Sequence, residues 1–162
     1  MAKPLPIFFH VEEFTVMSAI DIVKAGMAAT EAGDFDKLAG MLADDMVFAG
    51  PVPEPLGKRE FIAVQSAMRA AMPDWKFNGT DFKENGDQVT VMLQITGTQT
   101  GELKLPMPGM APVPATGKRV SLPKEPTTFT IKNGKVTRLE TAGVPGGGVM
   151  GVLAQLGVPM PR

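Results

Sequence analysis

Apolar residues in the first half of the chain recur at the spacing of α-helices. The pattern predicts a helix over residues 16–32, a short second helix that begins at Asp34, and a third helix that ends at Pro73. Gly33 and Asp34 suit this arrangement, because glycine favours the end of a helix and aspartate caps the start of one. A short strand at 46–48 is expected between the second and third helices.

From Trp75 onward the pattern changes to the alternation of β-strands. Strands are predicted over residues 75–84, 88–100, 118–132 and 135–142. Asn-Gly pairs at 85–86 and 133–134 join these strands two by two, and such pairs favour tight β-hairpins. Helices first and antiparallel hairpins afterwards predict an α+β fold, in which a curved sheet wrapped by the N-terminal helices forms a barrel or cone around a pocket.

A proline- and methionine-rich segment at 101–117 interrupts the β-rich half of the chain. Its four prolines cannot donate backbone hydrogen bonds, so the segment is expected to be a loop. A loop of this length in a compact domain is usually functional or disordered. Because it is apolar and carries Met107 and Met110, we interpret it as a lid over the mouth of a ligand pocket.

Length and composition narrow the possible functions. The 162 residues suit one domain, which we place at 1–162, with an extended arm at 1–15 and a short C-terminal helix at 149–157. Sixteen basic and 17 acidic residues are well mixed, which leaves no basic footprint for nucleic acid. Cysteine is absent and His10 is the single histidine, so we expect no metal. Since no segment suits a membrane span, we expect a cytoplasmic protein without a membrane partner.

The last hairpin carries a candidate polar anchor. With a two-residue turn at 133–134, the register predicts Phe129 opposite Arg138 and Thr127 opposite Glu140. This register puts Arg138 and Glu140 on the cavity side of the sheet, and a solvent-facing ion pair at the sheet edge is the alternative. Inside the cavity, Arg138 would lower the pKa of Glu140, which suits ligand anchoring better than proton transfer.

Further candidates share inward-facing positions or lie in the lid. Gln99 has the parity of the apolar residues of its strand, and it is either a ligand-binding amide or a structural bond to the lid backbone. Asp74 is an acid–base candidate, although an aspartate at this place more often caps a turn. The expected ligand-binding residues are Trp75, Phe77, Leu93, Ile95, Gln99, Met107, Met110, Phe129, Arg138 and Glu140.

Several segments together carry a family resemblance: GDFDKLAGMLADDMVF, Pro73-Asp74-Trp75, NGDQVTVMLQITGTQTGE, ATGKRV, FTIKNGKV and VLAQLGV. From about residue 16 onward the chain resembles the SnoaL-like polyketide cyclases. The resemblance implies the α+β cone of the nuclear-transport-factor superfamily, an apolar cavity, frequent dimers packed through their sheets, and no cofactor. A homodimer is accordingly expected through the outer face of the sheet, formed by Thr90, Met92, Gln94, Thr96, Thr128 and Thr130.

The same resemblance implies a catalytic histidine and a catalytic aspartate, and the chain departs from both. The histidine position holds Gln99, and the aspartate position holds Gly148. Isomerases, dehydratases and epoxide hydrolases of this superfamily rely on tyrosine, which the chain lacks. We therefore expect a protein that binds a small apolar or polyketide-like molecule, with no catalytic residue assigned. The alternatives are an isomerase or cyclase that uses Glu140 or Asp74 as acid–base, and a dimerisation module with a filled cavity.

Overall fold

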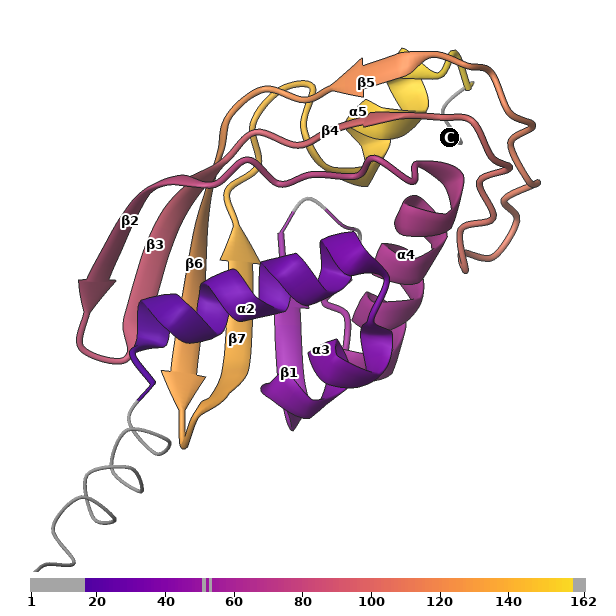
Figure 1. The fold of residues 1–162 in the computed structure, drawn as a ribbon. Coiled ribbons are helices and arrows are strands. Elements are labelled where there is room, and N and C mark those ends of the chain that lie inside the picture. The colour runs from indigo at the N-terminus through magenta and orange to yellow at the C-terminus, as the bar shows by residue number, and fades with distance from the viewer. Residues whose placement is uncertain (1–16, 51, 53, 159–162) are drawn as a thin grey trace, which may run out of the picture.

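The computed structural model describes residues 17–50, 52 and 54–158, so the expected arm at 1–15 and His10 lie outside the described residues. The elements in chain order are α2 (Ala19–Ala32), α3 (Phe35–Met41), β1 (Leu42–Ala49), α4 (Lys58–Ala71), β2 (Thr80–Asn85), β3 (Gln88–Leu93), β4 (Thr96–Thr98), β5 (Arg119–Ser121), β6 (Glu125–Lys132), β7 (Lys135–Thr141) and α5 (Gly148–Gln155). Helices precede strands along most of this order, which confirms the α+β prediction (Figure 1).

Five strands form one curved sheet in the order β1-β7-β6-β3-β2. The pairing of β1 with β7 is parallel, and the other pairs in this sheet are antiparallel. Helix α2 crosses one face of the sheet, α4 lies on the β1 side, and α5 lies beside β4 and β5 (Figure 1). Strands β1 and β2 remain as free edges among the described strands, so the sheet is open and does not close into a barrel.

Two of the predicted long strands are each divided in two. The strand expected at 88–100 breaks after Leu93, and the one expected at 118–132 breaks after Ser121. Pro123 lies in the second break, where an irregularity was predicted because proline cannot donate to a ladder. The detached ends pair with each other as a small sheet, β4-β5, which extends towards α5 (Figure 1).

Helix ends and hairpin turns follow local chemistry closely. The Ser18 hydroxyl accepts from the Asp21 N–H at the start of α2, and Gly33 ends that helix in the left-handed conformation at φ 76°. Asn133 and Gly134 both have positive φ, as the favoured two-residue hairpin turn requires. In the first hairpin the turn residues are 86–87, because Asn85 pairs with Gln88.

A β-bulge in β7 overturns the predicted register of the last hairpin. Ile131 pairs with Val136 as expected, but Thr130 then pairs with Arg138, so β7 carries one extra residue at Thr137. One inserted residue turns every following side chain to the opposite face of the sheet. Glu140 therefore pairs with Thr128 on the outer face, and the prediction that Arg138 and Glu140 face the cavity is wrong. Leu139, opposite Phe129, takes the inward position instead.

The segment at 101–117 is packed against the core. Leu103 and Val113 pair as an isolated antiparallel bridge, and both are buried. The Gln99 side chain fastens the segment: its amide Nε2 donates to the carbonyls of Gly101, Val113 and Pro114 at 3.1–3.2 Å. Its Oε1 accepts from the N–H of Thr116 at 3.0 Å and from the Thr116 hydroxyl at 2.6 Å.

Gln99→Ala is expected to lower the free energy of unfolding by about 2–4 kcal/mol, because buried groups at both ends of the segment lose their partners. Chemical denaturation measures this change. Gln94→Ala is the matched control, since Gln94 is exposed and should change stability by no more than about 0.5 kcal/mol. Equal losses in the two variants would contradict the fastening role of Gln99.

Candidate functional site

A pocket of about 380 Å³ lies between α4, the inner face of the sheet, the 101–117 segment and α5. Its wall is overwhelmingly apolar. Five of the predicted ligand-binding residues line it: Trp75, Phe77, Leu93, Ile95 and Met107. The volume is at the lower end of the range of small-molecule sites. An open pocket of this size argues against the alternative of a dimerisation module with a filled cavity.

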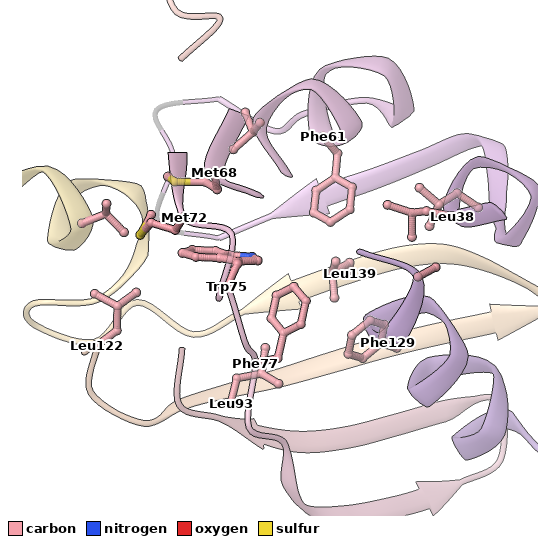
Figure 2. Packing of buried hydrophobic residues seen from close by; sticks show 14 of the residues in the cluster. Leu38, Phe61, Met68, Met72, Trp75, Phe77, Leu93, Leu122, Phe129 and Leu139 are labelled. Carbon is pink, nitrogen blue, oxygen red and sulfur yellow. The ribbon is translucent and has the colours of Figure 1, made fainter. Parts of the chain in front are cut away.

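Helix α4 and the extended stretch that follows it build one side of the pocket. Phe61, Val64 and Met68 recur on one face of α4 and line the pocket. After the helix ends, Trp75 and Phe77 point to the same side, and their rings meet edge to face with centroids 6.1 Å apart (Figure 2). This packing fixes the aromatic wall, since edge-to-face pairs favour one orientation.

Glu125 is the unexpected polar residue of the pocket. It is the first residue of β6, opposite Leu93, and its side chain lines the pocket while the residue is only 2% exposed. Burial raises the pKa of the Glu125 carboxyl above its ordinary value, and the backbone N–H of Gly148 opposes this effect more weakly. The carboxyl atom Oε1 has no hydrogen-bond partner. A carboxyl in such surroundings holds a proton more readily than an exposed one.

Sequence reasoning missed Glu125, although a signal for it exists. Glu125 has the same parity in β6 as Thr127, Phe129 and Ile131, and all four are buried. Extending the alternation back through Pro126 would have placed a carboxyl on the inner face. Because an irregularity was expected around the two prolines of this strand, the alternation was not extended to Glu125.

Two other buried polar atoms around the pocket lack partners. They are Gln65 Oε1 on α4 and Trp75 Nε1, and with Glu125 Oε1 they are the unpaired buried side-chain atoms found within residues 17–50, 52 and 54–158. All three residues line the same pocket. Because unpaired buried polar groups are rare in folded proteins, their concentration here favours a site that a polar ligand atom or water completes.

The remaining predicted ligand-binding residues lie elsewhere. Gln99 fastens the 101–117 segment, and Met110 packs against the core without lining the pocket. Phe129 borders a separate, smaller cavity of about 50 Å³. Arg138 and Glu140 form an exposed ion pair, with Nε and Oε1 3.0 Å apart, on the outer face. Arg138 and Glu140 therefore do not line the pocket. The structure has the alternative arrangement, a solvent-facing ion pair.

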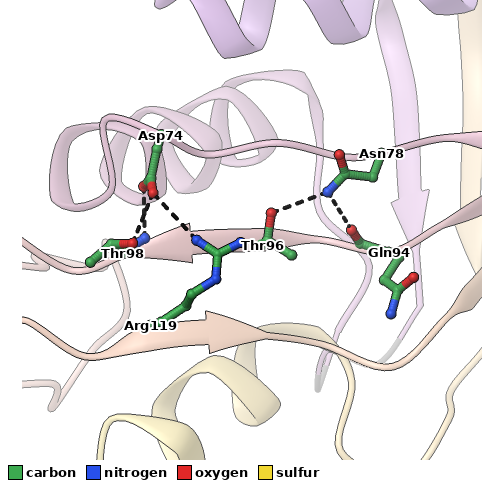
Figure 3. A network of polar contacts seen from close by, with 6 residues as sticks. All are labelled: Asp74, Asn78, Gln94, Thr96, Thr98 and Arg119. Carbon is green, nitrogen blue, oxygen red and sulfur yellow. Dashed lines mark hydrogen bonds and ion pairs between the residues drawn. The ribbon is translucent and has the colours of Figure 1, made fainter.

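Asp74 belongs to a surface network rather than to the pocket (Figure 3). Its carboxylate accepts from the N–H of Thr98 at 2.7 Å and from the Thr98 hydroxyl at 2.8 Å, with Arg119 3.7 Å away. The Thr98 N–H holds the pKa of the Asp74 carboxyl below its ordinary value. Asp74 thus ties the end of α4 to β4, and it does not meet a pocket ligand.

Within the described ranges, no three histidine, cysteine, aspartate or glutamate side chains gather as a metal ion would need. In the same ranges no helix combines the length and the apolar character required to cross a membrane.

Solved structures share this fold at low sequence identity. The candidate polyketide cyclase IdmH from Streptomyces antibioticus is 21% identical, with a TM-score of 0.65 over 88% of this chain and 100% of that chain. A candidate SnoaL-like polyketide cyclase from Jannaschia sp. CCS1 is 18% identical, with a TM-score of 0.66 over 88% and 93%. AclR, a candidate hydroxylase from Streptomyces galilaeus, is 19% identical, with a TM-score of 0.66 over 87% and 97%.

These likenesses establish the fold but not an activity, since cyclase and hydroxylase candidates both carry it. Among curated proteins, none matches this chain in sequence. The profile of the SnoaL-like domain matches residues 23–139, which is well over half of the chain. The chain therefore belongs to the SnoaL-like domain family.

Proposed function

We propose that the pocket binds a small, neutral and mainly apolar carbonyl compound, and that Glu125 exchanges a proton with it. The observation that carries the proposal is the buried carboxyl of Glu125, which has an unpaired oxygen and a raised pKa in an apolar pocket. A carboxyl shifted in this direction is better suited to acid–base work near neutral pH than an ordinary glutamate. The reaction class is that of an isomerase or cyclase.

The chemistry of the wall supports a neutral ligand. Besides Glu125, the charged residues that line the pocket are Arg59 and Glu60, and both are exposed on α4. An anionic ligand would meet the Glu125 carboxyl without a buried cation to balance it. The volume of about 380 Å³ suits a molecule of one to three rings, at the small end of ligand sites.

The proposed step begins with removal of a proton. The Glu125 carboxylate takes a proton from the carbon next to a carbonyl group, and the C–H electron pair moves towards the carbonyl oxygen to give an enolate. The N–H of Trp75 is the proposed donor to that oxygen, because it is a buried donor without a partner. In an isomerisation, Glu125 then returns the proton to a different atom of the enolate. In a cyclisation, the enolate carbon attacks a second carbonyl, and the alkoxide that forms takes the proton back from Glu125.

A binding protein without catalysis is the second candidate. The apolar wall and the modest volume serve such a role equally well. The two candidates differ in whether a bound ketone exchanges its acidic hydrogens through Glu125, so one experiment separates them.

Glu125 is expected to catalyse deuterium exchange into 2-tetralone, a bicyclic ketone with acidic hydrogens beside its carbonyl. Proton NMR in heavy water measures the rate of exchange, and the fluorescence of Trp75, the single tryptophan, reports binding. Glu125→Gln should slow the protein-catalysed exchange by roughly 100- to 10,000-fold while binding persists.

Glu140→Gln is the matched control for this experiment, since Glu140 lies exposed on the outer face and should leave the exchange unchanged. Binding without accelerated exchange in the unmodified protein would favour the binding-only candidate. An absence of both binding and exchange would count against the proposed ligand class altogether.

The pH dependence of stability provides a second test of Glu125. Its pKa is raised in the folded state, so its contribution to stability is fully present below the ordinary glutamate value of 4.5 and is lost as pH rises through the folded pKa. Glu125→Gln removes this loss. Thermal unfolding over a pH series should therefore show the variant gaining stability relative to the unmodified protein as pH rises.

The exposed Glu140→Gln variant should follow the unmodified protein across the same pH series. A difference between Glu125→Gln and the unmodified protein that stays constant with pH would show that Glu125 does not titrate abnormally.

The outer face of the sheet is the proposed surface for a homodimer. Met92 is half-buried, and Thr128 and Thr130 lie on the same face. The Arg138–Glu140 ion pair also lies on this face and adds polar contacts at its side. Met92, Thr128 and Thr130 are uncharged, and depletion of charge is typical of the core of an interface.

Light scattering at micromolar concentration is expected to give the mass of a dimer. Met92→Lys should shift the mass to that of a monomer, because it places a charge in the centre of an uncharged contact. Gly143→Lys, in a loop outside the sheet, is the control and should remain dimeric. A monomeric unmodified protein would contradict the proposal.

A further inference from the structure

Gly147 lies directly against the carboxyl group of Glu125. A Cβ atom at this position would be 3.0 Å from Glu125 Cδ, 3.1 Å from Glu125 Oε2 and 2.9 Å from Val144 Cγ2. These separations are shorter than side chains normally tolerate. The absence of a side chain at Gly147 is therefore what allows the carboxyl to reach the backbone of this turn.

The neighbouring glycines are required for other reasons. Gly146 and Gly148 have φ values of 83° and 70°, in the left-handed region that favours glycine. Gly151 packs so closely on the Gly146 carbonyl that a side chain would overlap it. Gly147 differs, because its φ of −97° is open to any residue. Backbone geometry therefore does not demand a glycine at Gly147, whereas the close contacts with Val144 and Glu125 favour one.

We propose that Gly147 is a positioning residue, whose missing side chain seats the Glu125 carboxyl against the N–H of Gly148 and so sets the balance between its acid and carboxylate forms. The inference deepens the proposed function and rests on it, because Glu125 is the group argued to exchange the proton. Gly148 and the following residues Val149, Met150 and Val152 also line the pocket. The segment 147–152 therefore both lines the pocket and contacts the Glu125 carboxyl.

No charged side chain competes with the backbone for this role. Glu125 takes part in none of the ion pairs found within the described residues. The turn and α5 contain no charged residue, since none occurs between Glu140 and Arg162. On the other packed elements, β3 is uncharged, Lys124 and Glu140 are exposed, and the α4 residues Arg59 and Glu60 are exposed at the pocket.

Two opposing effects then determine how Glu125 titrates. Burial favours the neutral acid, while the N–H of Gly148 favours the charged carboxylate. A methyl group at Gly147 would push the carboxyl away from that N–H without exposing it to water. The remaining effect is burial, so the carboxyl should keep its proton to higher pH.

Gly147→Ala tests this inference on the unliganded protein. Infrared spectroscopy follows the carbonyl band of protonated Glu125 during a pH titration, and Glu125→Gln identifies the band by removing it. The midpoint should move to higher pH in Gly147→Ala. Gly143→Ala is the matched control, because Gly143 lies in the same loop with nothing within 4 Å of its added Cβ, and its midpoint should match the unmodified protein.

A second variant separates the contact with Glu125 from the contact with Val144. Val144→Ala combined with Gly147→Ala removes the 2.9 Å contact with Val144 and retains the contact with Glu125. It should fold if the single variant does not, and it should keep the upward shift. A midpoint equal to that of Gly143→Ala in both variants would overturn the inference.

The exchange reaction supplies a functional readout. The pH at which 2-tetralone exchange reaches half its maximum should rise in Gly147→Ala and stay unchanged in Gly143→Ala. The infrared titration needs no ligand, so it can fail or succeed independently of the proposed function. An infrared shift without any exchange activity would support the positioning role of Gly147 and contradict the proposed reaction.

Discussion

Burial of a carboxyl group without an ionic partner is the constraint around which this pocket is organised. Such burial disfavours the charged form strongly, because an apolar wall cannot replace the water that a carboxylate loses. Glu125 is kept in that environment by elements from distant parts of the chain: β3 lies beside it, and the turn before α5 closes over it. If α5 were displaced, water would reach the carboxyl and Glu125 would become an ordinary surface acid.

The opposite wall of the pocket depends on polar contacts that are fully satisfied. Gln99 holds the 101–117 segment through both ends of its amide, and Asp74 holds β4 through Thr98. These bonds leave the apolar residues of the segment free to contact a ligand, with Met107 as the most adaptable of them. The satisfied amide of Gln99 therefore fixes the shape of the segment, while the unpaired oxygen of Glu125 remains available to a bound molecule.

Local signals in the sequence predicted the helices, the hairpins and five of the residues that line the pocket. Helix caps such as Gly33 and the turn at 133–134 depend on nearby residues only, so they could be identified directly. Trp75 and Phe77 were among the expected ligand-binding residues, and both lie in the pocket wall. The α+β fold followed from the order of these elements.

The polar part of the site could not be predicted in the same way. A bulge at Thr137 has no clear sequence signal, and it moved Arg138 and Glu140 to the outer face. Glu125 was within reach of a parity argument, but its burial depends on α5, which packs on it from the far end of the chain. Unpaired atoms such as Trp75 Nε1 are properties of three-dimensional packing and leave no mark in the sequence.

The parallel pairing of β1 with β7 has a consequence for how the protein is made. Phe48 pairs with Leu139, and both line the pocket, so this wall of the pocket joins β1 to a strand that is synthesised much later. Contacts this distant in sequence slow folding, and they leave the apolar faces of the N-terminal helices uncovered during synthesis. Because β6 and β7 form a hairpin, the same late step brings Glu125 into place. The acid is therefore buried only once the pocket around it can close.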